Sequence, residues 1–160
     1  MLKGKLYHKI PPWIEPGSRF HIRIRIGNIS KVDLTTPVIA QALVSSINYY
    51  HEHMKWYAWL AVLMPDHLHA ILSFPVRLSM SKVIGEWKKF HASLLHIEWQ
   101  SNYFDHRLRN DEEYTEKAYY VRMNPVRAQL CLKSEDWPWV VEPWKKAVAT
   151  ELDGYLWQNN

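Results

Sequence analysis

The sequence predicts an α+β fold of the ferredoxin-like type, in which an antiparallel sheet carries helices packed on one of its faces. The length of 160 residues suits a single domain covering residues 1–160. Segments with strand and helix periodicity follow one another in the order strand, helix, strand, strand, helix, strand, helix. Split units in this order are typical of that fold.

The chain opens with an irregular arm and a half-buried strand. Residues 1–18 contain three prolines, which disfavour a helix or a central strand. Residues 20–26 then alternate apolar and polar side chains without a break. This alternation predicts a strand whose second face carries His21, Arg23 and Arg25.

A helix and a hairpin follow. Thr36 and Pro37 form a helix start, with threonine as N-cap and proline at the first helical position, and apolar residues extend the helix to about Tyr50. Residues 56–64 are almost entirely apolar and predict a buried strand. Pro65 and Asp66 form a turn, so residues 67–74 are expected to be its hairpin partner.

The next elements are a second helix and a fourth strand. Ser79 or Ser81 is expected to cap a helix that runs to about Trp99, with apolar residues on one side and lysines near the other. Residues 103–109 are expected to be a strand or an extended segment.

The third helix is expected to open at Asn110, because Asn110 and Glu113 have the spacing of a capping box. It should reach Asn124, where Pro125 ends or kinks it. The tail, residues 133–160, is rich in tryptophan, and its pattern assigns it no place in the fold.

Composition sets broad limits on function. The net charge of +4 and the pI of about 9.1 fit a nucleic-acid partner but are shared by many other proteins. Nine Trp and nine Tyr can fill a core or offer faces for stacking unpaired bases. The single cysteine, the absence of a signal peptide and the absence of a long apolar run predict a cytoplasmic protein.

Two histidines share one face of the predicted hairpin. His67 and His69 flank Leu68, so both rings point the same way, about 6.6 Å apart along the strand, while Leu68 enters the core. The pair can form half of a metal site. It can equally be a pair of surface or hydrogen-bonding histidines, because a His-x-His spacing alone is a weak motif.

The third helix offers a ligand and a nucleophile. Tyr120 and Asn124 are four residues apart and therefore share a helical face. The Asn124 carbonyl oxygen suits a hard cation such as Mg²⁺ or Mn²⁺. The Tyr120 phenol can attack phosphorus when a metal polarises the target. Alternatively, Tyr120 is an ordinary aromatic of an amphipathic helix.

Several segments together resemble the REP-associated tyrosine transposases, a branch of the single-tyrosine transposases within the HUH endonuclease superfamily. They span most of the chain in the family's order. The segments are Trp13 with Pro16-Gly17, residues 62–69 (Val-Leu-Met-Pro-Asp-His-Leu-His), Trp99-Gln100 with residues 103–109 (Tyr-Phe-Asp-His-Arg-Leu-Arg), residues 120–128 (Tyr-Val-Arg-Met-Asn-Pro-Val-Arg-Ala), and Trp137-Pro138-Trp139.

The resemblance implies a metal-dependent enzyme that cuts and rejoins single-stranded DNA. His67 and His69 match the metal-binding histidine pair, Asn124 matches the third ligand of a Mg²⁺ or Mn²⁺ ion, and Tyr120 matches the nucleophile. The implied products are a 5′-phosphotyrosine and a free 3′-OH. The implied partner is a palindromic hairpin, and the implied setting is the nucleoid of a bacterial cell.

The chain departs from the family pattern at two positions. Asp66 stands where asparagine often precedes the first histidine, and a carboxylate there could tighten metal binding. Gln129 stands where glycine is common, which could change how the third helix exits. Tyr119 adjoins Tyr120, but the two cannot share a helical face, and only Tyr120 has Asn124 four residues later.

Basic residues near these motifs are candidates for phosphate contacts, although any one of them can be solvated surface. The candidates are Arg23, Arg25, Lys88, Lys89, Arg107, Arg109, Arg122 and Arg127.

Two other classes of protein compete with the nuclease. A domesticated relative could bind hairpin DNA without cutting it. A histidine-triad phosphohydrolase would need a third alternating histidine, and position 71 is Ile71. A monomer and a homodimer are both compatible with the sequence.

Overall fold

A computed structural model describes residues 10–15, 18–27 and 31–145. The expected order of the elements is confirmed, with short additions near the end of the described chain. The elements are β1 (Arg19–Arg25), α1 (Pro37–Glu52), β2 (Tyr57–Leu63), β3 (His67–Ser73), α2 (Met80–Leu95), β4 (Phe104–Leu108), α3 (Asp111–Arg122), α4 (Asn124–Arg127), a 3-10 turn (Ser134–Asp136) and β5 (Val140–Val141).

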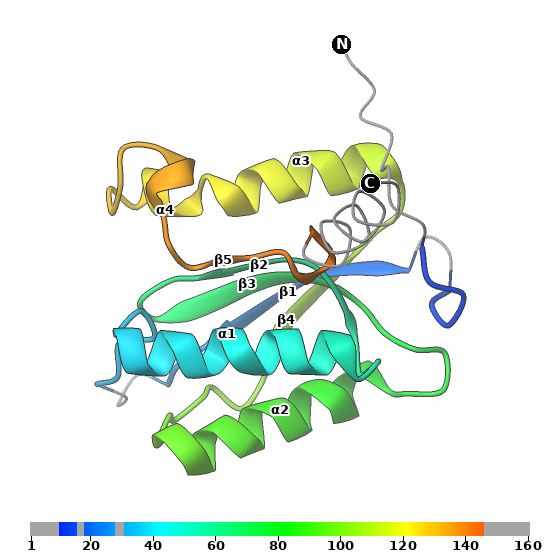
Figure 1. Ribbon diagram of the computed structural model, residues 1–160, viewed down its shortest axis with the longest axis horizontal. Coiled ribbons are helices and arrows are strands. Elements are labelled where there is room, and N and C mark those ends of the chain that lie inside the picture. The colour runs from blue at the N-terminus through cyan, green and yellow to red at the C-terminus, as the bar shows by residue number, and fades with distance from the viewer. Residues whose placement is uncertain (1–9, 16–17, 28–30, 146–160) are drawn as a thin grey trace, which may run out of the picture.

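The five strands form one antiparallel sheet in the order β4-β1-β3-β2-β5. Helices cover both faces, with α1 and α2 below the sheet and α3 above it in Figure 1. The α+β class is confirmed, but the expectation that helices pack on one face was wrong. The strands explain why: β2 is buried along its whole length, so both of its faces need a cover.

Each face of the sheet has its own hydrophobic core. On the α1 and α2 side, Leu68, Ala70 and Leu72 pack with residues such as Leu43 and Trp87. On the α3 side lie residues such as Trp59, Ile71, Tyr114 and Val121. The predicted alternation of β3 is therefore confirmed, and it turns His67 and His69 toward the α3 side, where His69 lies against Tyr120.

The tail completes the sheet. Val140 and Val141 pair with β2, and the indole N–H of Trp137 donates to the Leu63 carbonyl at 2.9 Å. The Trp144 indole donates to the Trp59 carbonyl at 2.8 Å. These tryptophans thus anchor a fifth strand that the sequence pattern did not reveal. The remainder of the tail, residues 146–160, and residues 1–9, 16 and 17 of the arm lie outside the described residues.

Two helices end earlier than expected. The second helix stops at Leu95 instead of about Trp99, because His96 adopts a left-handed conformation with φ of 55°. The third stops at Arg122, and Asn124 opens the separate helix α4. Pro125 lacks the N–H that would continue the helix, so its predicted effect as a helix breaker is confirmed. The left-handed conformation of Gln129, with φ of 60°, explains why glycine suits that position.

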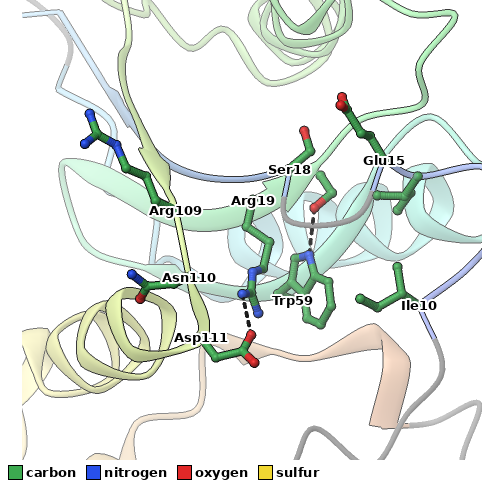
Figure 2. Close-up of a pocket in the computed structure, with 10 residues that line it drawn as sticks. Ile10, Glu15, Ser18, Arg19, Trp59, Arg109, Asn110 and Asp111 are labelled. Atoms are coloured by element: carbon green, nitrogen blue, oxygen red, sulfur yellow. Dashed lines mark hydrogen bonds and ion pairs between the residues drawn. The ribbon is translucent and has the colours of Figure 1, made fainter.

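The start of α3 is tied to the sheet by a buried arginine. Figure 2 shows Arg19 pointing toward Asp111 beside Trp59, and the Arg19 Nη2 to Asp111 Oδ1 distance is 2.7 Å. The guanidinium carbon lies 5.3 Å from the Trp59 ring centroid and 4.5 Å from that of Tyr114. These contacts border a cavity of about 280 Å³. They hold α3 across the sheet, which positions the far end of the helix.

A buried histidine in the other layer makes stability depend on pH. His91 is buried against Trp87, and its Nε2 lies 2.7 Å from the Ser46 hydroxyl. Burial lowers the pKa of His91 from its ordinary value of 6.5 to about 4. The unfolded chain therefore binds more protons below pH 6.5, and stability is lost as the pH falls toward 4.

Glutamine at position 91 can keep the hydrogen bond to Ser46 and does not titrate. We therefore expect the free energy of unfolding of His91→Gln to fall by about 2 kcal/mol less than that of the unsubstituted protein between pH 7 and pH 5. Urea unfolding at the two pH values measures the difference. His53→Gln, at an exposed position, is the matched control. If the free energy of unfolding of His91→Gln depended on pH as strongly as that of the unsubstituted protein, His91 would not be the source of the pH dependence.

Candidate active site

The two histidines converge at the start of β3. The Nε2 atoms of His67 and His69 lie 3.2 Å apart. A nitrogen ligand lies about 2.1 Å from a small divalent ion, and this separation is less than twice that length, so both atoms can bind one ion. This distance is compatible with two ligands of one ion, and the metal site itself stays a prediction.

Asp66 orients His67. The Asp66 Oδ1 lies 2.6 Å from the His67 Nδ1, so this Nδ1 carries a proton and donates it to the carboxylate. Such a carboxylate–histidine pair leaves Nε2 with a free lone pair and raises its basicity. Burial raises the pKa of Asp66, but the hydrogen bond and charge of His67 and the charge of Arg25 outweigh it and lower the pKa overall.

Both rings are neutral near pH 7. Burial lowers the pKa of His69 to about 2, and the charges of His67, His21, Arg23 and Arg25 act in the same direction. Burial also lowers the pKa of His67 despite the opposing effect of Asp66. Neutral imidazoles are the form that binds metal ions.

In the part of the chain that the structure describes, a third ligand would be of a type other than His, Cys, Asp or Glu. Among the described residues no group of three His, Cys, Asp or Glu side chains could hold a metal ion. An amide such as Asn124 is outside that set of residue types. Asn124 is half-buried and is the first residue of α4, which follows α3 directly. It is therefore not on the same helix as Tyr120. Its role as a ligand stays a prediction.

Tyr120 lies beside the histidine pair. Its ring meets that of His69 edge-on, with the centroids 6.3 Å apart. Tyr120 is 44% exposed and Tyr119 is 65% exposed. The structure thus brings together Tyr120 and His69 from two separate elements, as the nucleophile hypothesis requires.

Two cations hold the Tyr120 ring. The Arg127 guanidinium carbon lies 4.0 Å from the ring centroid and the Lys117 Nζ lies 4.7 Å from it. The Arg127 Nη2 also donates to the Tyr120 backbone carbonyl at 2.7 Å. Both cations therefore restrict where the ring can lie and place positive charge near the phenol.

A groove of about 380 Å³ runs beside Tyr120 between α3 and β4. Its lining residues are His106 and Leu108 from β4 and Glu113, Glu116, Lys117 and Tyr120 from α3. The groove therefore adjoins the candidate nucleophile, and two of its lining residues carry carboxylates, which do not attract a nucleic-acid backbone.

The basic candidates fall into two groups. In the pairing of β1 with β3, Arg23 lies opposite His69 and Arg25 opposite His67. Their placement beside the pair is compatible with phosphate contacts. Arg127 lies on Tyr120, as described above.

The other basic candidates are engaged elsewhere or lie apart from the pair. Arg122 donates to Glu142 at 2.6 Å, and the buried Lys88 donates to the Gln100 carbonyl at 2.7 Å from the opposite face of the sheet. Lys89 is exposed on the same helix as Lys88, and Arg107 is exposed on the edge strand β4. Arg109 borders the cavity at Arg19.

Comparison with known proteins assigns the family. The family model described as "Transposase IS200 like" matches residues 18–124, which include both histidines, Tyr120 and Asn124. The chain belongs to the IS200-like transposase family. This match, together with the two relatives described next, bears out the resemblance to REP-associated tyrosine transposases.

Two REP-associated tyrosine transposases are similar to this chain, one in sequence and one in structure. A REP-associated tyrosine transposase of Escherichia coli K12 is 29% identical over 86 residues, which are 51% of this chain and 50% of the relative. The chain thus spans about half the length of this curated relative. The structure of a REP-associated tyrosine transposase bound to a REP hairpin matches with a TM-score of 0.66 at 21% identity, covering 83% of this chain and 81% of that one. This match confirms the fold.

Among the described residues, no helix is long and apolar enough to cross a bilayer. The cytoplasmic and nucleoid location and the choice between monomer and dimer stay predictions.

Sequence reasoning did not assign a site role to His21, Lys117 or Glu142. His21 was placed on the correct face of its strand, but which side chain it meets depends on strand register. Lys117 was recognisable in principle, because it precedes Tyr120 by three residues and therefore neighbours it on the helix. Glu142 lies far from Arg122 in the chain, and no local pattern connects the two.

Proposed function

We propose that the chain is a metal-dependent endonuclease and transesterase that acts on single-stranded DNA carrying a hairpin. One observation carries the proposal: the Nε2 atoms of His67 and His69 lie 3.2 Å apart, and the His69 ring meets the Tyr120 ring edge-on. A pair of metal ligands next to a phenol is the arrangement that nucleophilic attack on a phosphodiester needs. Family membership supports the same chemistry.

In this proposal His67, His69 and Asn124 hold Mg²⁺ or Mn²⁺. When bound, the ion supplies charge neutralisation and polarisation of the scissile phosphate. Asp66 keeps the His67 proton on Nδ1. Arg127 and Lys117 hold the Tyr120 ring and favour the negative charge that develops on its oxygen and on the phosphate.

The proposed reaction exchanges one phosphate ester for another. The Tyr120 Oη attacks phosphorus, the P–Oη bond forms as the P–O3′ bond breaks, the phenol proton passes to solvent and the leaving O3′ takes up a proton. The products are a 5′-phosphotyrosine and a 3′-OH. Because the number of phosphate ester bonds is unchanged, attack by a 3′-OH rejoins the strand without ATP.

The proposed substrate is a palindromic hairpin, as in the related protein whose structure is bound to a REP hairpin. Arg23 and Arg25 lie across from the two histidines and are the best-placed candidates for the DNA backbone. The net charge of +4 favours a polyanionic partner.

We expect the purified chain to form a covalent complex with a labelled hairpin oligonucleotide that has a single-stranded flank, in Mg²⁺ or Mn²⁺ and not in excess chelator. Denaturing electrophoresis detects the slow-moving adduct, and native electrophoresis detects binding in parallel. A panel of oligonucleotides that each contain one short palindrome supplies the substrates.

Binding without an adduct in either metal would support the competing class, a domesticated hairpin-binding protein that no longer cuts. Absence of both binding and adduct across the panel would contradict the proposed partner.

A further inference from the structure

A third histidine lies against the pair. His21, from β1, stacks on His69 with ring centroids 5.1 Å apart and planes 18° from parallel. The His21 Nε2 and the His69 Nδ1 are 2.9 Å apart. His21 is 4% exposed, and its Nδ1 is buried with no hydrogen-bond partner in the structure.

Together with Asp66, the three rings form a continuous chain of hydrogen bonds. A neutral imidazole carries one proton, so one of its nitrogens donates and the other accepts. The His67 Nδ1 donates to Asp66, so the His67 Nε2 accepts, and the close His69 Nε2 is then the donor. The His69 Nδ1 must therefore accept, from the His21 Nε2.

This arrangement of protons does not suit a metal ligand. Binding an ion needs a lone pair on the Nε2 of both His67 and His69. The His69 proton then has to be on Nδ1, where its only neighbour in this chain of rings is the His21 Nε2. His21 must accept this bond, and its own proton must occupy Nδ1, the buried atom without a partner.

We propose that His21 is a positioning residue that holds the His69 ring and determines which of its nitrogens carries the proton. The inference rests on the proposed metal site and extends it to a residue on another strand. His21 supplies the acceptor that the metal-binding form of His69 needs. The metal-free form is favoured until an ion binds, because only there does the His69 Nε2 donate to the His67 Nε2, 3.2 Å away.

Two substitutions separate the hydrogen bond from the packing. His21→Phe keeps a stacked ring but removes the acceptor. His21→Gln places an amide oxygen near the position of Nε2, an acceptor that needs no proton shift. Calorimetric titration of the full chain with Mn²⁺ should show about 10- to 100-fold weaker binding for His21→Phe. His21→Gln should bind as tightly as the unsubstituted protein or more tightly.

Thermal unfolding without metal identifies a purely structural effect. If His21 only filled space, both variants would have a lower melting temperature, and Mn²⁺ affinity would not fall in His21→Phe while being kept in His21→Gln. Equal Mn²⁺ affinity in His21→Phe and the unsubstituted protein, with His67→Ala still weakened, would overturn the inference alone. If the unsubstituted protein and His67→Ala bound Mn²⁺ equally, the proposed metal site itself would fail.

Nitrogen-15 NMR of the unsubstituted protein gives a test that needs no variant. The His69 proton should be on Nε2 without metal and should move to Nδ1 when a diamagnetic ion such as Mg²⁺ is added. A His69 proton already on Nδ1 in the metal-free protein would overturn the inference.

Discussion

Replacing Tyr120 with phenylalanine is expected to abolish covalent capture of a hairpin oligonucleotide, a fall of about 10⁴-fold or more in rate. The substitution removes the attacking oxygen and leaves the ring, which packs edge-on against His69 and under Arg127. Folding and hairpin binding should therefore persist. Single-turnover cleavage of a labelled hairpin, followed on denaturing gels, measures the rate.

Tyr119→Phe is the matched control, because the adjacent tyrosine differs in position and not in chemistry. Tyr119 is 65% exposed, and successive helical residues point about 100° apart. Its variant should form the adduct at the normal rate. An adduct that survives in Tyr120→Phe and disappears in Tyr119→Phe would mean that the other tyrosine is the nucleophile.

The second large effect is expected for His67→Ala, which should weaken Mn²⁺ binding by more than about 100-fold. Loss of a residue that only supports a ligand already costs about 10- to 100-fold, and loss of the ligand itself should cost more. It also leaves the Asp66 carboxylate without its 2.6 Å partner. Cleavage should fail at low metal and recover in part at high Mn²⁺, since His69 remains. Calorimetry and cleavage measured over a range of Mn²⁺ concentrations test both statements.

His53→Ala is the control for this experiment. His53 is an exposed histidine that follows α1, in the layer on the other side of the sheet from Tyr120. Its loss should leave Mn²⁺ affinity unchanged. Unchanged affinity in His67→Ala would mean that the histidine pair does not bind the ion.

Local patterns predicted most of the fold. Alternation in residues 20–26 and 67–74 predicted two strands and which of their side chains share a face, because successive side chains of a strand point to opposite faces of the sheet. Asn110 was correctly predicted as the cap of α3: its side chain accepts from the Glu113 N–H at 2.8 Å. Glu113 in turn accepts from the Arg109 N–H at 2.6 Å.

What the patterns missed depends on contacts between distant parts of the chain. The second helical layer follows from the burial of β2 on both faces, and a continuous apolar run does not say what covers it. The two-residue strand β5 is too short for any periodicity and is held by the Trp137 and Trp144 indoles. Lys88 has the spacing of a surface lysine, yet its ammonium group donates hydrogen bonds to two backbone carbonyls of the loop after α2.

The same distinction applies to the site. The spacing within His67 and His69, and between Tyr120 and Asn124, is local and could be read directly. The approach of α3 to β3, the pairing of Arg23 with His69 and the contact of His21 with His69 depend on sheet order and register. No single segment specifies these.

The central claim is that the chain cuts DNA through a covalent bond to Tyr120. The most direct test is mass spectrometry of the adduct after nuclease trimming and proteolysis. We expect a residual nucleotide, linked through its 5′ phosphate, on the peptide that contains Tyr120, and fragmentation should assign it to Tyr120 and not to Tyr119. A nucleotide on any other residue, or cleaved DNA without a protein-linked nucleotide, would contradict the account.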